Sequence, residues 1–117
     1  MSADERPVRR VSQLTRLVPA KREEYLELHA HVWPAVEQRL REAGIENYTI
    51  FVRDDLLVAY YEYRGEDLDA ALRFIGEDPE TRRWWTFTDP CQIDPEPGTP
   101  GGPWRDLTEV WHLDPLG

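Results

Sequence analysis

The strongest pattern in the chain is a helical one over residues 20–43, and it constrains the fold more than any other feature. Its apolar side chains recur at intervals of three and four residues: Tyr25, Leu28, Val32, Val36, Leu40 and Ala43. This spacing gives one apolar stripe that has to be buried against another element. Pro34 lies inside the segment and cannot donate a backbone hydrogen bond, so we expect a kink or a split there. Gly44 is the expected stop of the helix.

Short apolar and aromatic runs on both sides of this segment have the pattern of strands. The expected strands are residues 10–18, 46–53, 56–63 and 105–113. Asp54 and Asp55 are expected to form the turn of a hairpin between the second and third strands. Helical spacing returns over residues 66–77, Pro79 interrupts it, and a further short helix is expected over residues 79–88.

The resulting order, β-α-β-β-α-β, predicts an α+β fold of the ferredoxin-like type, with helices on one face of an antiparallel sheet. The other face needs a cover if it is apolar, and in a short chain the expected cover is a second copy. Residues 1–117 are expected to form one domain. Residues 1–8 look like a loose polar leader, and residues 90–103 look like a Pro/Gly-rich loop that acts as a flap or linker.

Charge and cysteine content restrict the partners and the compartment. The formal net charge is −9 at pH 7, which disfavours nucleic acid and membranes and is compatible with a neutral small molecule. We therefore expect no nucleic-acid or membrane partner. Cys91 is the only cysteine, which suits a reducing compartment, and the N-terminus lacks the apolar core of a signal peptide. The expected location is the cytoplasm.

His29 is the first candidate for chemistry. Tyr25 precedes it by four residues and Trp33 follows it by four, so the three side chains project from nearly the same helix face. An imidazole on an aromatic, mostly apolar wall can exchange protons near neutral pH. A core histidine bonded to a backbone carbonyl would show the same pattern, so this feature alone leaves both interpretations open.

The sequence around His29 carries no metal or cofactor motif. His31 forms a His-x-His pair with it, but residues two apart on a helix point to nearly opposite sides, and the sequence has no Cys/His cluster to add ligands. It also lacks a phosphate-binding loop, a dinucleotide fingerprint and a nucleophile elbow. We expect proton-transfer chemistry with no metal and no cofactor.

Three aromatic residues are candidates for ligand binding. Trp84 and Trp85 are adjacent on an expected helix, so they point about 100° apart. One can fill the core while the other seals an interface, or both can present flat faces to the C–H surface of a sugar. Tyr48 can reach toward His29 if its strand lies under the long helix.

Together these residues resemble the L-rhamnose mutarotase family. The resemblance rests on Tyr25-x-x-x-His29-x-x-x-Trp33-Pro34, Ala43-Gly44-Ile45-x-Asn47-Tyr48-x-Ile50, Arg83-Trp84-Trp85 and Glu109-Val110-Trp111-His112-Leu113, and it extends over residues 9–114. It implies a homodimeric α+β barrel of ferredoxin-like subunits, with neither metal nor nucleotide. It further implies a catalytic role for His29 and sugar-binding roles for the residues Tyr25, Tyr48, Trp84 and Trp85.

The implied enzyme is an isomerase of carbohydrate metabolism that interconverts the α and β anomers of a deoxyhexose, with L-rhamnose as the first candidate. A base takes the proton of the anomeric hydroxyl, an acid protonates the ring oxygen, and one imidazole can fill one role and then reverse it. The family tends to carry methionines after its paired tryptophans. This chain has Thr86-Phe87-Thr88-Asp89-Pro90 there, which bears on the identity of the sugar.

Two other functions stay open at the level of sequence. A cofactor-free oxygenase or cyclase on the same barrel, acting on an aromatic or polyketide molecule, would also use an aromatic pocket with one histidine. A non-catalytic dimeric ligand-binding module is the third possibility. An open pocket with a polar rim favours a sugar, whereas a deep, dry, apolar pocket favours the oxygenase or cyclase.

Overall fold

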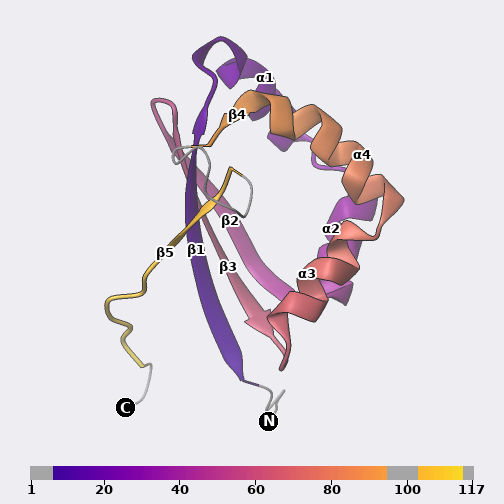
Figure 1. Cartoon of the computed structure of the whole chain (residues 1–117), viewed down its shortest axis with the longest axis vertical. Coiled ribbons are helices and arrows are strands. Elements are labelled where there is room, and N and C mark those ends of the chain that lie inside the picture. The colour runs from indigo at the N-terminus through magenta and orange to yellow at the C-terminus, as the bar shows by residue number, and fades with distance from the viewer. Residues whose placement is uncertain (1–6, 95–102, 115–117) are drawn as a thin grey trace.

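The computed structural model describes residues 7–94 and 103–114. Within these residues, four α-helices cover one face of an antiparallel sheet (Figure 1). The strands are β1 Val8–Leu17, β2 Ile45–Arg53, β3 Leu56–Arg64, β4 Gln92–Ile93 and β5 Arg105–Leu107. The helices are α1 Arg22–Ala30, α2 Pro34–Glu42, α3 Leu68–Gly76 and α4 Pro79–Thr88. The α+β, antiparallel, ferredoxin-like architecture predicted from the order of elements is confirmed.

Strand β1 is the centre of the sheet. It pairs with β3 along one edge, and β3 pairs with β2 in the predicted hairpin, so the order is β2-β3-β1. The other edge of β1 is shared, because β4 pairs with Arg16–Leu17 and β5 pairs with Ser12–Leu14. Residues from both ends of the chain therefore meet on one central strand.

The long helical segment splits at Pro34, as predicted. Helix α1 ends at Ala30, Trp33 is extended with φ −67° and ψ 132°, and Pro34 occupies the first turn of α2. The residue before a proline is pushed out of the helical region, and a proline at a helix start loses no hydrogen bond. The break places His29 in the last turn of α1, next to the split.

Gly44 ends α2, also as predicted. Its φ is +90°, and its N–H donates to the carbonyl of Arg41 at 3.0 Å. A Cβ at this position would lie 2.8 Å from the carbonyl oxygen of Arg64. Only glycine fits this close approach at a positive φ, and the turn delivers the chain directly into β2.

The prediction of one loop over residues 90–103 was wrong at its start. Gln92–Ile93 form β4 because the free edge of β1 accepts their backbone hydrogen bonds. Residues 95–102 of that loop lie outside the described residues, as do residues 1–6 of the expected leader. Val8, the last residue of that leader, instead begins β1 and pairs with Arg64.

The prediction of a last strand over residues 105–113 was too long. Strand β5 ends at Leu107, and residues 108–114 run on without regular structure, away from the helices (Figure 1). The strand pairs with β1 over three residues. His112 therefore lies beyond the strand, and Val110, Trp111 and Leu113 are strongly exposed.

Alternate residues of β3 point toward the helices and form two separate core clusters in the part of the chain that is described. One cluster lies under α3 and comprises Ile45, Tyr61, Tyr63, Ala71 and Ile75. The other lies by α1 and comprises Leu17, Tyr25, Leu57 and Cys91.

None of the described helices is long and apolar enough to cross a membrane.

Candidate active site

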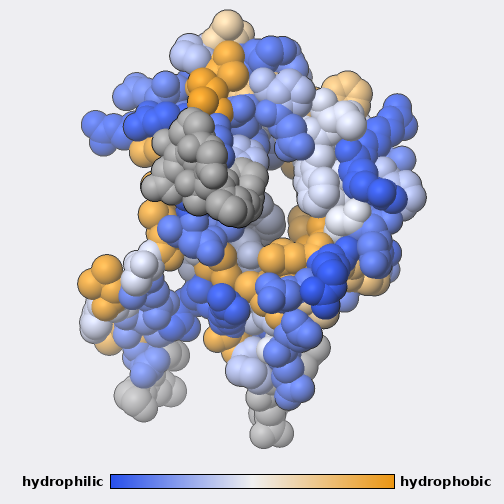
Figure 2. All heavy atoms as spheres, viewed as in Figure 1, coloured by the Kyte–Doolittle hydropathy of each residue, from blue (hydrophilic) through white to orange (hydrophobic). Residues whose placement is uncertain are grey.

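A cavity of about 640 Å³ lies between the helices and the sheet. All four helices and strands β1, β2 and β3 contribute to its lining, and His29, Tyr48, Trp84 and Trp85 are among the lining residues. In the space-filling view the molecule is hollowed between its sheet side and its helix side (Figure 2). The structure thus gathers four of the five predicted site residues around one space.

The hydrogen bond of His29 fixes which ring nitrogen is free. Nδ1 lies 3.0 Å from the carbonyl oxygen of Tyr25, one helical turn earlier. Because a carbonyl oxygen can only accept, Nδ1 carries the proton in the neutral ring and Nε2 keeps its lone pair. Nε2 is therefore the atom available to exchange a proton with a ligand in the cavity.

Burial keeps this imidazole neutral. Desolvation lowers the pKa of His29 below its ordinary value of 6.5, and the bond to the Tyr25 carbonyl raises it by a smaller amount. A neutral imidazole at physiological pH can accept a proton, as a general base must.

Two aromatic rings hold His29 in place. Tyr25 stacks on it with ring centroids 4.2 Å apart and an interplanar angle of 27°. Trp84 meets it edge-on at 5.3 Å and also meets Trp33 edge-on at 5.2 Å. The ring is held between these neighbours, which limits its rotation.

Tyr25 is placed differently from the other predicted site residues. Its side chain is 2% exposed and is absent from the cavity lining. Its hydroxyl interacts with the side chain of Gln92, and burial raises its pKa above the ordinary value. In this structure Tyr25 supports His29 through its ring and its carbonyl.

The adjacent tryptophans of α4 are divided between the core and the open space. Trp84 is 5% exposed and Trp85 is 38% exposed, and both line the cavity. Asp78 caps the start of α4 by accepting from the backbone N–H of Thr81 at 3.0 Å. The cap fixes where the helix begins and thereby the direction in which each indole points.

Tyr48 reaches the cavity through an irregularity in β2. The pairing of β2 with β3 shifts between Glu46 and Thr49, and Asn47 there has a φ of +53°. The side-chain amide of Asn47 donates to Glu62 at 2.9 Å. The bulge turns Tyr48 toward Tyr61, with ring centroids 5.3 Å apart. Tyr48 is 42% exposed as a whole, and local desolvation of its hydroxyl raises the pKa to about 12.

Two polar residues of the sheet wall were missed by sequence reasoning. Gln13 on β1 and Tyr61 on β3 both line the cavity. The available signal was weak: Gln13 is a long polar side chain two residues from Val11 and from Thr15, on the face that a strand under helices should keep apolar. Tyr61 was hidden in a run of aromatic residues.

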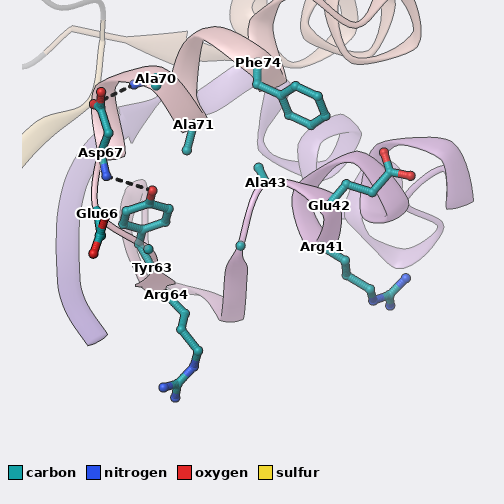
Figure 3. Close-up of a pocket in the computed structure, with 12 residues that line it drawn as sticks. Arg41, Glu42, Ala43, Tyr63, Arg64, Glu66, Asp67, Ala70, Ala71 and Phe74 are labelled. Carbon is teal, nitrogen blue, oxygen red and sulfur yellow. Dashed lines mark hydrogen bonds between the residues drawn. The ribbon is translucent and has the colours of Figure 1, made fainter. Parts of the chain in front are cut away.

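His31 and a second hollow lie outside this site, although Arg41 lines both the cavity and the second hollow. His31 is exposed, and its Nε2 lies 3.9 Å from a carboxylate oxygen of Glu27. The described residues contain no group of three or more His, Cys, Asp or Glu that could hold a metal ion. A hollow of about 670 Å³ near the start of α3 carries side chains of both charges that diverge, including Arg41, Arg64 and Glu66 (Figure 3).

The fold and the site define a class: a ferredoxin-like α+β protein with one neutral histidine in an aromatic cavity. Sequence comparison gives the family. The profile of the L-rhamnose mutarotase family matches residues 10–113, and the chain belongs to that family.

Curated relatives cover nearly the whole chain. The L-rhamnose mutarotase of Lactiplantibacillus plantarum is 31% identical over 105 residues, which are 90% of this chain and 98% of that protein. The L-rhamnose mutarotase of Listeria monocytogenes serovar 1/2a is 31% identical over 106 residues, 89% of this chain and 97% of that protein.

Solved structures support the fold. An L-rhamnose mutarotase from Formosa agariphila superposes with a TM-score of 0.69 at 23% identity, covering 91% of this chain and 99% of the other. Tetracenomycin F2 cyclase from Streptomyces glaucescens, a type II polyketide cyclase, superposes with a TM-score of 0.66 at 14% identity and the same coverage. At these identities the likeness concerns the fold alone.

Proposed function

We propose that this protein is an isomerase that interconverts the α and β anomers of L-rhamnose, with His29 as the group that transfers the proton. One observation carries the assignment of His29: its Nδ1 is committed to the Tyr25 carbonyl, so that a basic Nε2 remains on the wall of the cavity. Family membership supplies the reaction and the sugar.

The reaction needs only the movement of protons. Nε2 of His29 takes the proton from the anomeric hydroxyl, the C1–O bond to the ring oxygen breaks, and C1 becomes an aldehyde carbon. The ring oxygen gains a proton from an acid. Rotation about C1–C2 followed by the reverse steps closes the ring on the other face, with no net gain or loss of protons.

The remaining site residues receive roles from their positions. Trp84 and Trp85 offer indole faces to the C–H surface of the sugar, and Tyr48 positions the hydroxyls of the sugar. The hydroxyl of Tyr48 is protonated at physiological pH, as that of any tyrosine is, so it can donate a hydrogen bond to the sugar. Tyr25 contributes to sugar binding by fixing the His29 ring against which the sugar lies.

Saturation-transfer NMR on equilibrated L-rhamnose tests the proposal. We expect the protein to accelerate exchange between the anomers, and we expect His29→Ala to lower the catalysed rate by about 10²- to 10⁴-fold. His31→Ala is the matched control, because the same change falls on an exposed histidine two residues away. Full activity in His29→Ala would contradict the proposed mechanism.

The cyclase or oxygenase alternative is not favoured. Its structural support is a likeness of fold at 14% identity, whereas the family match extends over residues 10–113. The cavity also carries amide, hydroxyl and imidazole groups on its walls, including Gln13, Asn47, Tyr48 and Thr81. A lining of this kind suits the hydroxyls of a sugar better than an apolar polyketide.

The proposal includes a homodimer in the cytoplasm. The sheet face opposite the helices carries Phe51, which is 61% exposed, and Leu107, which is 40% exposed. A second copy packed on this face would remove both side chains from water. The single thiol of Cys91 suits a reducing compartment.

A further inference from the structure

A polar cluster on the sheet wall of the cavity has no role in the chemistry described so far. It consists of Gln13 on β1, Tyr61 on β3 and Asp106 on β5, and is called here the Gln13 cluster. Gln13 and Tyr61 line the cavity. Asp106 is the cross-strand partner of Gln13.

The orientation of the Gln13 amide follows from its partner. Its Nε2 lies 2.7 Å from Oδ1 of Asp106. A carboxylate can only accept, so the nitrogen of the amide must face Asp106. The carbonyl oxygen Oε1 and the second N–H of the amide remain for another partner.

The register of the sheet shows which side chains flank this amide on the cavity face. Gln13 pairs with Ala59, and Ala59 pairs with Ile50, so the three side chains form one row on the face beneath the helices. Ala59 is buried at 1% exposure, and the two longer side chains that flank it, Gln13 and Ile50, line the cavity. His29 lines the same cavity from the helix layer.

Tyr61 extends the polar wall. It is two residues from Ala59 along β3, on the same face. Burial, and to a lesser extent the Asp106 carboxylate, raises the pKa of Tyr61. Its hydroxyl is protonated at physiological pH and adds a second polar group to the cavity lining.

We propose that Gln13 is a specificity-determining residue that binds ring hydroxyls of the sugar, and that Asp106 is a positioning residue that orients the Gln13 amide. The amide offers one acceptor and one donor, which two neighbouring hydroxyls of a pyranose can satisfy together. This inference rests on the proposed function, because it names a sugar as the ligand of the same cavity. It adds to the proposed function that the ring hydroxyls of the sugar are bound at the sheet wall of the cavity.

The steady-state kinetics of the Gln13→Leu variant with L-rhamnose test the inference. We expect KM for L-rhamnose to rise about tenfold with kcat little changed, because a hydrogen bond to the substrate is lost in ground and transition states alike. We also expect the variant to discriminate less between L-rhamnose and its epimers at C2 and C4. Gln38→Leu is the matched control, since Gln38 is exposed on α2 and outside the cavity lining.

Two variants of Asp106 distinguish a role in orienting the Gln13 amide from a purely structural role. Asp106→Ala should raise KM in the same direction as Gln13→Leu but by less, because the amide is freed and not removed. Asp106→Asn should restore KM close to that of the native protein, because its side-chain oxygen still accepts from Gln13. Equal KM values in the native protein, Asp106→Ala and Asp106→Asn would overturn the positioning role of Asp106.

Direct binding distinguishes failure of this inference from failure of the proposed function. L-Rhamnose is titrated by tryptophan fluorescence in the His29→Ala background, with and without Gln13→Leu, and thermal melting confirms that each variant is folded. Gln13→Asn is the milder second variant should Gln13→Leu unfold. Unchanged affinity and epimer preference without the Gln13 amide would refute the inference while mutarotation by the native protein persists. If the native protein does not accelerate mutarotation but L-rhamnose binding still depends on the Gln13 amide, the proposed function is refuted and this inference stands.

Discussion

At the scale of the residue, His29 satisfies both interpretations that the sequence left open, a core histidine and a proton-transfer group. It is bonded to a backbone carbonyl, as a structural core histidine would be, and the residue also lines a cavity, as a catalytic base requires. The carbonyl bond selects the tautomer, and the tautomer leaves Nε2 basic. A structural contact and a chemical role therefore coexist in one ring.

The lowered pKa of His29 predicts the pH dependence of the reaction. The catalytic form is the neutral imidazole, and its folded-state pKa lies below 6.5 because of burial. We expect kcat/KM, corrected for the uncatalysed rate, to stay level from neutral pH to below 6.5 and then to fall as the ring takes a proton. Anomer exchange measured across a pH series checks this. A decline already between about pH 8 and pH 7 would show that His29 is not the titrating base.

At the scale of the element, two backbone constraints position the site. The split at Pro34 ends α1 one residue after His29, and the turn at Gly44 sends the chain from α2 into the strand that carries Tyr48. Both were predictable because proline and glycine act through local geometry. The bulge at Asn47 was not predictable, since its hydrogen bond to Glu62 comes from a different strand.

The turn at Gly44 makes a stability prediction. Gly44→Ala should lower the free energy of unfolding by about 1–3 kcal/mol, because its φ is +90° and the new Cβ would press on the Arg64 carbonyl. Gly76→Ala is the matched control: it lies in α3, and its Cβ would meet the Trp85 ring at 3.6 Å, an ordinary contact. Denaturant unfolding of both variants measures the difference. Equal stabilities would mean that the Gly44 turn tolerates a side chain.

At the scale of the whole molecule, the sheet is covered on one face only within the described residues (Figure 1). On the other face Leu14, Val58 and Phe51 lie in one row across β1, β3 and β2, as the pairing register shows. Such a row is apolar and continuous, which is typical of a surface that associates with a copy of itself.

The homodimer proposed above makes a prediction about this face. Phe51→Asp should shift the protein from dimer to monomer, because a carboxylate would be buried without a partner in the interface. Phe87→Asp is the matched control, since Phe87 is an exposed phenylalanine on α4, on the helix side. Light scattering coupled to size-exclusion chromatography measures the mass. A native protein with the mass of one chain would contradict the dimer.

The sequence was sufficient to predict the order of the elements up to α4, the break at Pro34, the stop at Gly44 and the four site residues that share a cavity. These follow from periodicity, from backbone geometry and from motifs, all of which are local properties of the chain. Three features became visible in the folded structure alone: β4 and β5 share an edge of β1, Tyr25 lies behind His29, and Gln13 joins the cavity wall. Those features depend on pairing between segments distant in the chain, since Asp106 orients Gln13 across 93 positions of sequence. A local hydrophobic pattern can set which face of a strand is buried, but it does not tell which distant strand will pair with it.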